Sequence, residues 1–347
     1  NVLGLGLWPR YSVIDMPGFL TEVHVMGYGC LKDVRCSLTP LHAFIGPNDS
    51  GKSTLLRAIQ TVLTPKLYRD IHAFAKFVDR SDLRINYGGN DGIFGTDHAA
   101  RIVPAHVLFA DETLKNTMAV RVGKGLAQVQ MVRLSADELR QPSSLIPFGT
   151  PLVMAGRGSN LAGLYDALRD RSNDRFTAIS QRLTDHFPSV QSLGLQAMSG
   201  GVKVLTAKLL DGKEILSDAM SEGLLYYLAF AILGELQRPA VYLVEEPENG
   251  LHPARIADIV AILRTVAEDT KDPVQIVMAT HSPLVVNELR PEEVTVVRRD
   301  PLKGTSLTPI KQTPHFEERS KAYALGELWL SYADGKLEAP LFDSEGR

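Results

Sequence analysis

One run of nine residues constrains the fold of this chain more than any other: Gly46-Pro47-Asn48-Asp49-Ser50-Gly51-Lys52-Ser53-Thr54. It fits the pattern G-x-x-x-x-G-K-[ST], in which glycines let successive backbone N–H groups turn toward a phosphate. Apolar residues at 41 and 43–45 predict a buried strand before the run, and apolar residues at helical spacing over 55–63 predict a helix after it. This order of strand, loop and helix predicts a phosphate-binding loop in an α/β fold.

Two side chains of this loop have predicted roles. We expect Lys52 to reach the β- and γ-phosphates of a nucleotide, and the Ser53 hydroxyl to ligate Mg²⁺. All nine residues, 46–54, are predicted to bind the nucleotide. The loop therefore predicts a site for a nucleoside triphosphate together with Mg²⁺.

A pair of acids follows a second predicted strand. Residues 241–244 are apolar and lead directly into Glu245 and Glu246. A hard cation on a nucleotide needs an oxygen ligand, usually through water, and the attacking water needs an acceptor that orients it. We expect Glu245 in the first role and Glu246 in the second. Acids that close a strand are otherwise usually solvated, but the phosphate-binding loop upstream favours the functional interpretation.

A third predicted strand, 274–280, ends in His281. This places an imidazole at the same carboxyl edge of a parallel sheet, where open α/β sheets bind ligands. We therefore interpret His281 as a sensor of the γ-phosphate rather than a structural histidine.

Three motifs together resemble one family. They are Gly-Pro-Asn-x-x-Gly-Lys-Ser at 46–53, Glu-Glu-Pro-Glu-Asn-Gly-Leu-His-Pro at 245–253 and Ala-Thr-His-Ser-Pro at 279–283. The set is similar to the ABC-type ATPase head shared by RecF, SMC and OLD-family proteins, and most similar to stand-alone AAA-family ATPases related to OLD. The resemblance implies an α/β P-loop NTPase of ABC-ATPase type, with a mixed sheet, an antiparallel β arm, an inserted helical subdomain, and ATP and Mg²⁺ as ligands.

The resemblance also assigns roles within these motifs. It implies that Glu245 is the Walker B acid, Glu246 the catalytic base, 248–252 the D-loop and His281 the switch histidine. Heads of this family work in pairs, with each nucleotide between the phosphate-binding loop of one copy and a signature loop of the other. The resemblance therefore implies an ATPase that forms an ATP-dependent homodimer.

A signature loop is expected at residues 220–223, Met-Ser-Glu-Gly, ahead of the apolar run 224–233. Ser221 is predicted to cap the helix, so that the helix-start N–H groups and Gly223 face the γ-phosphate of a partner. The family more often has Ser-Asp-Gly there. An alternative register, 216–219, has Ser-Asp but lacks the glycine, which hinders close backbone approach to phosphate. An ordinary capped core helix is the other interpretation.

Residues 137–143 resemble the Q-loop region of these ATPases, after predicted strands at 118–122 and 128–134. The resemblance implies that Gln141 ligates Mg²⁺ and reports the nucleotide state to the helical subdomain. A solvated glutamine in a polar loop is the alternative.

Residues 156–162 are interpreted as a helix start without a ligand, capped by Ser159 or Asn160.

The chain of 347 residues exceeds a usual single core, and we divide it into five parts. Residues 1–15 are expected to be a non-native or disordered extension, because Met16 is a reasonable start. Residues 16–150 form the N-terminal ATPase lobe, 151–235 the helical and signature subdomain, 236–335 the C-terminal part of the ATPase lobe, and 336–347 a tail. Within these parts we predict a surface loop at 85–92, an antiparallel arm over 99–134, helices over 160–187, and a hairpin from 202–209 and 214–216.

Net charge, apolar run length and cysteine count limit the kinds of partner and compartment that we expect for this chain. The formal charge of −3 gives no global attraction to nucleic acid or membrane, although local basic patches leave nucleic acid open as a partner. No apolar run approaches the roughly 20 residues that cross a bilayer, so no membrane partner is expected. Cys30 and Cys36 are the two cysteines and suggest no disulfide framework, which favours a reducing, cytoplasmic compartment.

The sequence contains neither of two features found in related ATPases, a long coiled-coil arm and a nuclease domain. About 190 residues separate Lys52 from Glu245 without sustained heptads, which excludes a long coiled-coil arm. Fifty residues follow Val297, too few for the nuclease domain of OLD-type proteins, so an effector is expected on another chain.

The favoured function is Mg²⁺-dependent ATP hydrolysis at a dimer that drives or gates a partner, and the resemblance suggests DNA repair or defence against mobile elements. The alternative is a nucleotide-gated scaffold with little turnover that docks nucleic acid or an effector protein. A transporter ATPase is disfavoured, because the chain lacks an Asp-Glu pair at the strand end and a Leu-Ser-Gly-Gly-Gln signature.

Overall fold

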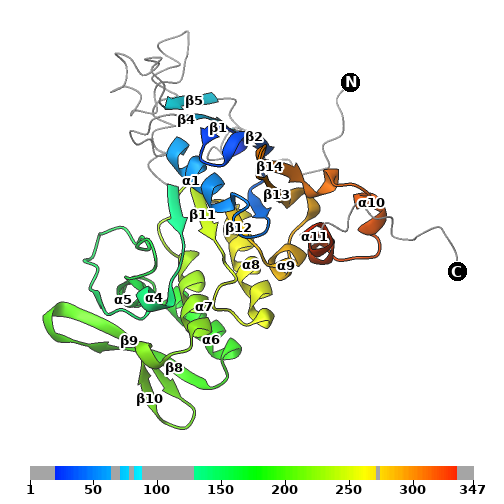
Figure 1. Ribbon diagram of the computed structural model, residues 1–347. Helices are drawn as coiled ribbons and strands as arrows, with labels where there is room; N and C mark the ends of the chain where they lie inside the picture. The colour runs from blue at the N-terminus through cyan, green and yellow to red at the C-terminus, as the bar shows by residue number, and fades with distance from the viewer. Residues whose placement is uncertain (1–19, 64–70, 78–81, 88–128, 271–273, 334–347) are drawn as a thin grey trace, which may run out of the picture.

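The computed structural model describes residues 20–63, 71–77, 82–87, 129–270 and 274–333 (Figure 1). The predicted extension 1–15, the tail 336–347 and the predicted strand 118–122 lie outside these residues. None of the helices in the described ranges is long and apolar enough to cross a membrane.

A six-stranded sheet forms the centre of the molecule, in the order β14-β13-β3-β12-β11-β6. Five strands run parallel, and β14 pairs antiparallel with β13 at one edge. The mixed sheet predicted from the resemblance is therefore confirmed. In chain order its strands are β3 (Leu41–Ile45), β6 (Val129–Val132), β11 (Val241–Glu245), β12 (Gln275–Thr280), β13 (Val294–Asp300) and β14 (Gly304–Pro309).

Alternate side chains of the central strands enter two separate cores. Phe44 and Val277 pack on one face, against α1 (Lys52–Leu63) and strands of a second sheet. Ala43 and Met278 pack on the other face, with the apolar residues of α7 (Glu222–Leu233) and α8 (Pro253–Ala267). Because both faces are covered, β3, β11 and β12 are buried at every position rather than at alternate ones.

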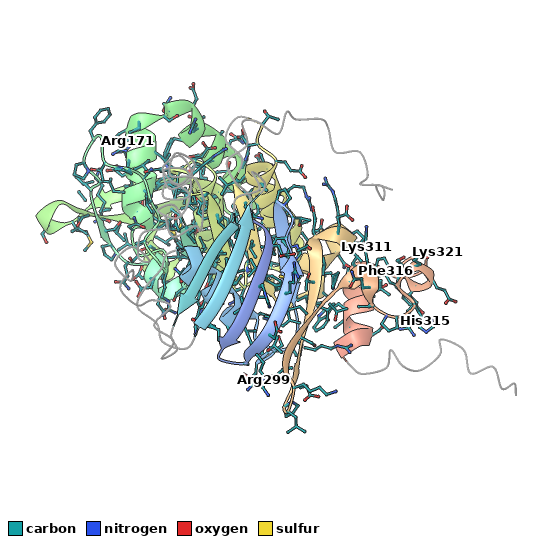
Figure 2. All side chains as sticks on the ribbon, turned by 90° about the horizontal axis from the view of Figure 1, so that it is seen from above. Arg171, Arg299, Lys311, His315, Phe316 and Lys321 are labelled. Carbon is teal, nitrogen blue, oxygen red and sulfur yellow. The ribbon has the colours of Figure 1, made fainter. Side chains whose placement is uncertain are left out.

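The second sheet is antiparallel throughout, in the order β2-β1-β4-β5. Figure 2 shows its strands side by side. Gln275 of β12 ties it to the central sheet, because its buried amide donates to the carbonyls of Leu20 and Thr39 over 2.7 and 3.0 Å. The strands are β1 (Leu20–Tyr28), β2 (Leu31–Ser37), β4 (Ile71–Phe77) and β5 (Asp82–Tyr87).

Two predictions about this region need correction. The surface loop predicted at 85–92 is wrong at its start, because residues 85–87 belong to β5 and pair with β4. The antiparallel arm predicted over 99–134 is wrong at its end, because β6 pairs parallel with β11, with Val132 opposite Val244. An apolar strand can pair in either direction, and the partner of β6 lies over a hundred residues away. Residues 99–128 lie outside the described residues.

A lobe of helices and a small sheet lies at the β6 end of the central sheet (Figure 1). Its helices confirm the helical prediction for 160–187, and β9 and β10 form the predicted hairpin. The sheet of β8, β9, β10 and the short β7 was not predicted as a unit. The elements are α4 (Ala136–Leu139), β7 (Ser143–Ser144), α5 (Leu161–Arg171), α6 (Asn173–His186), β8 (Val190–Ala197), β9 (Val202–Leu209) and β10 (Glu214–Leu216).

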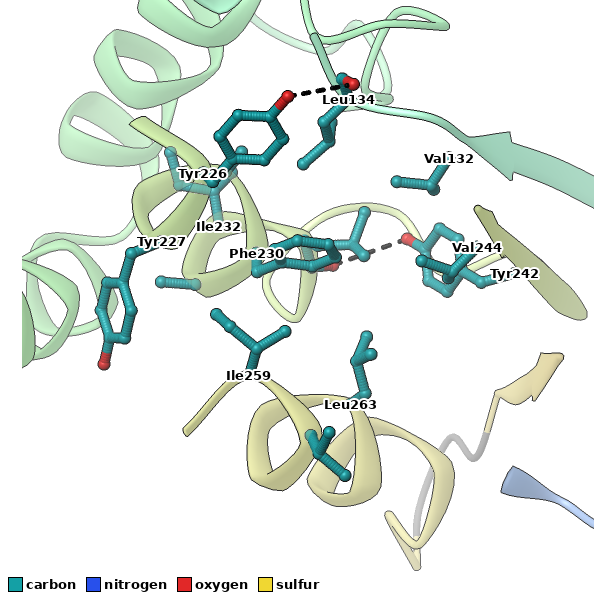
Figure 3. Packing of buried hydrophobic residues seen from close by; sticks show 14 of the residues in the cluster. Val132, Leu134, Tyr226, Tyr227, Phe230, Ile232, Tyr242, Val244, Ile259 and Leu263 are labelled. Carbon is teal, nitrogen blue, oxygen red and sulfur yellow. Dashed lines mark hydrogen bonds between the residues drawn. The ribbon is translucent and has the colours of Figure 1, made fainter. Parts of the chain in front are cut away.

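Helix α7 joins this lobe to the central sheet. From Leu224 to Leu233 every residue is buried, as expected for a helix that is apolar on all sides. Figure 3 shows Tyr226 and Phe230 between strand and helix side chains of the larger core. The Tyr226 hydroxyl donates to the Leu134 carbonyl over 3.4 Å, which satisfies a polar group that burial would otherwise leave unpaired.

Three short or C-terminal helices complete the described chain: α9 (Pro283–Asn287), α10 (Phe316–Arg319) and α11 (Leu325–Ala333). Helix α11 packs against α9, where the Gly326 backbone N–H donates to Asn287 Oδ1 over 2.7 Å. The close approach requires glycine, because a Cβ at residue 326 would overlap the Pro283 backbone.

Candidate functional site

Four neighbouring parallel strands bring the predicted loop, acids and histidine to one edge of the sheet, together with Arg133. The phosphate-binding loop follows β3, His281 follows β12, Glu246 follows β11 and Arg133 follows β6. Since all four strands run in the same direction, their carboxyl ends meet at that edge. This is the edge at which open α/β sheets place their ligands.

The phosphate-binding loop lies between β3 and α1, which begins at Lys52. Asp49 and Gly51 have left-handed backbones, with φ of 65° and 106°. A side chain at Gly46 would overlap the carbonyl of Val297 on β13. Arg299, also on β13, reaches the loop with Nη1 2.6 Å from Asp49 Oδ2 (Figure 2). The loop is therefore held by its own backbone and by the neighbouring strand.

Lys52 is folded back into this loop. Its ammonium donates to the carbonyls of Gly46 and Pro47 over 2.7 and 2.8 Å, and the residue is 7% exposed. Burial lowers the pKa of Lys52, and the nearby negative charges of Glu246 and Glu248 oppose that shift. The amine thus lies within the electrostatic reach of the acids that follow β11.

Glu245 is the last residue of β11, and its side chain is 5% exposed. Its Oε2 lies 3.2 Å from Nε of Arg133, a residue that the sequence analysis did not select. Arg133 follows Val132, which pairs with Val244, so the two side chains leave adjacent strands at the same level. Only the register of β6 against β11 indicates that Arg133 lies beside Glu245. This register follows once β6 is known to pair parallel with β11.

The donor set fits Mg²⁺ held partly by a nucleotide. Ser53 is exposed on the first turn of α1 and offers a hydroxyl, and Glu245 offers a carboxylate. Among the described residues no three His, Cys, Asp or Glu side chains group closely enough to hold a metal by themselves. Mg²⁺ usually keeps several waters and binds through one or two protein oxygens plus phosphates. The two protein oxygens offered by Ser53 and Glu245 agree with that pattern.

Glu246 begins a tight turn after β11. Its φ of 49° is left-handed, which is uncommon for a residue with a side chain and is concentrated at functional sites. Its backbone N–H donates to the Ala279 carbonyl over 2.8 Å, and its Oε2 accepts from Asn249 Nδ2 over 2.7 Å. Backbone and side chain are therefore both fixed at the edge.

His281 lies next to this acid. Its Nδ1 is 3.6 Å from Glu246 Oε1 and 3.4 Å from Glu248 Oε1, and its side chain is 44% exposed. Glu248 Oε1 also accepts from the Thr280 hydroxyl over 2.7 Å and from the His281 N–H over 3.1 Å. The resemblance assigned Glu248 only to the D-loop, whereas in the structure its side chain contacts the end of β12.

The predicted signature residues lie at the start of α7. Ser221 is the N-cap and accepts from the Leu224 N–H over 3.3 Å, which confirms its capping role. A Cβ on Gly223 would lie 3.4 Å from the carbonyl of Gly250, so the helix start lies against the predicted D-loop of its own chain. Ser217, from the alternative register, is buried and donates its hydroxyl to the Arg140 carbonyl over 2.6 Å. Ser221 is exposed, whereas Ser217 is not.

Gln141 lies just beyond α4 and is exposed. Its Nε2 donates to the Asp137 carbonyl over 2.9 Å. The preceding residue, Arg140, donates to the Met220 carbonyl over 3.4 Å, which links this segment to the loop before Ser221. Ligation of Mg²⁺ by Gln141 stays a prediction, and the residue that contacts Glu245 from this part of the chain is Arg133.

The predicted helix start near residue 160 is confirmed, because α5 begins at Leu161 with Asn160 at its N-cap position. The Asn160 side chain makes no cap hydrogen bond to α5. Its Oδ1 accepts from the Ala155 N–H over 2.8 Å, and its Nδ2 donates to the Val153 carbonyl over 2.9 Å. Asn160 therefore fixes the preceding loop.

The mixed sheet, with the loop at 46–54 between β3 and α1, has the strand, loop and helix order of a P-loop α/β fold. Two family models match the chain. One is described as "AAA domain, putative AbiEii toxin, Type IV TA system" and matches residues 153–287. The other is described as "AAA ATPase domain" and matches residues 19–94.

The chain is also similar to a curated protein, the OLD nuclease of Thermus scotoductus, with 25% identity over 346 residues. The match covers 81% of this chain and 62% of the length of the OLD nuclease. These findings confirm the predicted likeness to ATPase heads of the OLD-like group.

Among solved structures, SMC heads overlap most of the chain. An Smc head bound to the C-winged helix domain of ScpA is 15% identical, with a TM-score of 0.49 and coverage of 84% of this chain and 97% of that one. The SMC head domain from Thermotoga maritima is 11% identical, with a TM-score of 0.43 and coverage of 84% and 98%. An Smc head from Pyrococcus furiosus is 11% identical, with a TM-score of 0.49 and coverage of 88% and 100%.

Proposed function

We propose that this chain is an ATPase that binds ATP with Mg²⁺, closes as a pair of copies around the nucleotide and thereby drives or gates a partner. One observation carries the proposal. The amine of Lys52, the turn at Glu246 and the imidazole of His281 meet at one edge, where His281 Nδ1 is 3.6 Å from Glu246 Oε1. Phosphoryl transfer to water uses a cation on the phosphates and a group that orients the attacking water, and Lys52 and Glu246 suit these two roles.

Each group has a separable role in this proposal. When ATP binds, the Lys52 ammonium moves from the Gly46 and Pro47 carbonyls to the phosphates. The phosphate charge makes these new hydrogen bonds stronger than those to the carbonyls. Ser53 and Glu245 would hold Mg²⁺, which supplies positive charge to the phosphate oxygens when bound. Glu246, fixed by Asn249, orients the attacking water. Rate enhancement comes from positioning and preorganised charge rather than from a covalent step.

The proposed dimer places Ser221 and Gly223 of one copy against the nucleotide of the other. Support comes from the exposed start of α7, whose N–H groups and helix dipole suit an anion. Within one chain, this helix start lies against residues 248–252, since a Cβ on Gly223 would be 3.4 Å from the Gly250 carbonyl. A second copy that bound there would complete a site that one chain leaves open.

The test uses Glu246→Gln, with Lys52→Ala and a surface control, Glu214→Gln on β10. We expect Glu246→Gln to keep ATP bound and accumulate dimers while turnover falls by a factor on the order of 100 or more, as for loss of a general base. Lys52→Ala is expected to lose ATP affinity, and Glu214→Gln to behave as wild type. Binding is followed with a fluorescent ATP analogue and turnover by phosphate release. Undiminished turnover in Glu246→Gln would remove that residue from the role.

A second candidate is a nucleotide-gated scaffold that turns over little ATP and docks nucleic acid or an effector protein. The Ser-Glu-Gly sequence at 221–223, in place of the more usual Ser-Asp-Gly, favours it. Turnover measured with and without DNA and RNA separates the two functions. Likeness to an OLD nuclease makes DNA repair or defence against mobile elements the proposed setting. Proteins and nucleic acid that co-purify with Glu246→Gln in ATP would identify the partner.

A further inference from the structure

The pair formed by Arg133 and Glu245 is an unusual arrangement for a carboxylate expected to serve a metal. Glu245 is 5% exposed on its side chain, whereas Arg133 is 55% exposed, and Nε lies 3.2 Å from Oε2. The carboxylate is thus buried at the strand end, and the guanidinium beside it is largely exposed.

A buried carboxylate needs such a neighbour. Removal of a charge from water costs several kcal/mol unless an opposite charge or hydrogen bonds compensate. The other cations of the edge have other partners in the described chain: Lys52 donates to the carbonyls of Gly46 and Pro47, and His281 faces Glu246 and Glu248. Arg133 is therefore the cation that neutralises Glu245 in the described contacts.

A guanidinium and a divalent cation cannot both occupy the same face of this carboxylate. Arg133 is mostly exposed, so its side chain can swing away without breaking the core. A guanidinium binds phosphate oxygens well, because its planar N–H groups match their spacing. The triphosphate that would bring Mg²⁺ to Glu245 would therefore also give Arg133 a new anionic partner.

We propose that Arg133 is the resident counter-charge of Glu245, which divalent metal displaces readily only when nucleotide arrives with it. This regulation rests on the proposed ATP site. It makes metal loading depend on nucleotide, and it predicts that free Mg²⁺ binds the nucleotide-free chain weakly because it must first displace the guanidinium.

The test measures Mg²⁺ binding to the full chain by calorimetry in the absence of nucleotide. We expect Arg133→Gln to bind Mg²⁺ about fivefold more tightly than wild type, the factor that loss of one half-exposed ion pair would give. Arg133→Lys keeps the charge and is expected to stay nearer to wild type. Arg133→Met provides a second neutral variant in case Arg133→Gln folds poorly, which thermal unfolding reports.

Two controls locate the effect. Arg35→Gln removes a similar exposed arginine, whose Nη2 lies 2.9 Å from Glu22 Oε1 in the antiparallel sheet, and should leave Mg²⁺ affinity unchanged. Adding Glu245→Gln to Arg133→Gln should abolish the gain. Equal Mg²⁺ affinity in wild type and both neutral variants, with ATP binding intact, would overturn the role of Arg133 alone. Failure of wild type to bind an ATP analogue with Mg²⁺ would instead overturn the proposed function.

Discussion

At the scale of single residues, Glu248 has a different task from the other acids of the edge. One of its oxygens accepts from the Thr280 hydroxyl and from the His281 N–H, and the same oxygen lies 3.4 Å from the imidazole. The other oxygen, Oε2, is buried and has no hydrogen-bond partner within the described chain. A buried acid of this kind holds the strand end in place, and we interpret Glu248 as a positioning residue for His281.

We predict that Glu248→Ala lowers kcat roughly 10- to 100-fold, with little change in KM for ATP, because a misplaced sensor affects the transition state more than binding. Glu248→Gln keeps an acceptor for Thr280 and the His281 N–H, so it should recover much of the loss. Steady-state phosphate release gives both constants. A change in KM without a change in kcat would assign Glu248 to nucleotide binding instead.

At the scale of elements, buried polar links fix the strands that carry the site. His42 is the second residue of β3, with Nε2 3.0 Å from Thr295 Oγ1 on β13 and Nδ1 3.1 Å from Thr39 Oγ1. Burial lowers the pKa of His42 from 6.5 to about 3. The imidazole is therefore neutral in the folded protein over the physiological range and joins the strand before the phosphate-binding loop to its neighbour.

This link predicts a pH dependence of stability. In the unfolded chain His42 binds a proton below pH 6.5, whereas in the folded chain it does so only near pH 3. Its contribution to stability is thus complete above 6.5 and is lost progressively as the pH falls toward 3. We expect the free energy of unfolding to drop by about 2 kcal/mol between pH 7.5 and pH 5 from this residue.

Urea unfolding at pH 7.5 and pH 5 checks this expectation. His42→Gln should show a pH-dependent loss smaller by about the same 2 kcal/mol, since the variant has no imidazole to protonate at this position. Equal pH dependence in wild type and variant would contradict it.

At the scale of the whole molecule, the proposal requires two copies, since Lys52 and Ser221 of one chain would serve different nucleotides. Each copy has one phosphate-binding loop, which carries Lys52, and one start of α7, which carries Ser221. Variants of the two residues should therefore complement each other.

We predict that Lys52→Ala and Ser221→Arg are each inactive alone, and that a mixture recovers part of the wild-type turnover. The mixed dimer has one site with an intact lysine and an intact partner serine. Lys52→Ala mixed with Glu246→Gln is the matched control and should stay inactive, because both residues serve the same site of one chain. Phosphate release during titration of one variant into the other measures this. Absence of recovery from folded variants that still dimerise would argue against a shared site.

The local pattern was sufficient for much of this structure. The glycine-rich loop at 46–54, the apolar runs before it and before Glu245 and His281, and the cap at Ser221 all depend on residues close together in the chain. Parallel strands collect their carboxyl ends at one edge, so these segments implied a common site once each was recognised. Turn-forming residues and hydrophobic periodicity are local properties of the chain, so they can be predicted directly from the sequence.

Other features were decided by tertiary structure. The direction of β6, the pairing of Arg133 with Glu245 and the contact of Glu248 with the end of β12 join residues that are distant in the chain. Strand order and register arise from packing of the whole sheet, and an apolar strand of four residues can pair either way. The sequence therefore determined which groups we expect to contact phosphate. The assembled sheet decided which charges lie beside them, because neighbours across strands have no fixed separation along the chain.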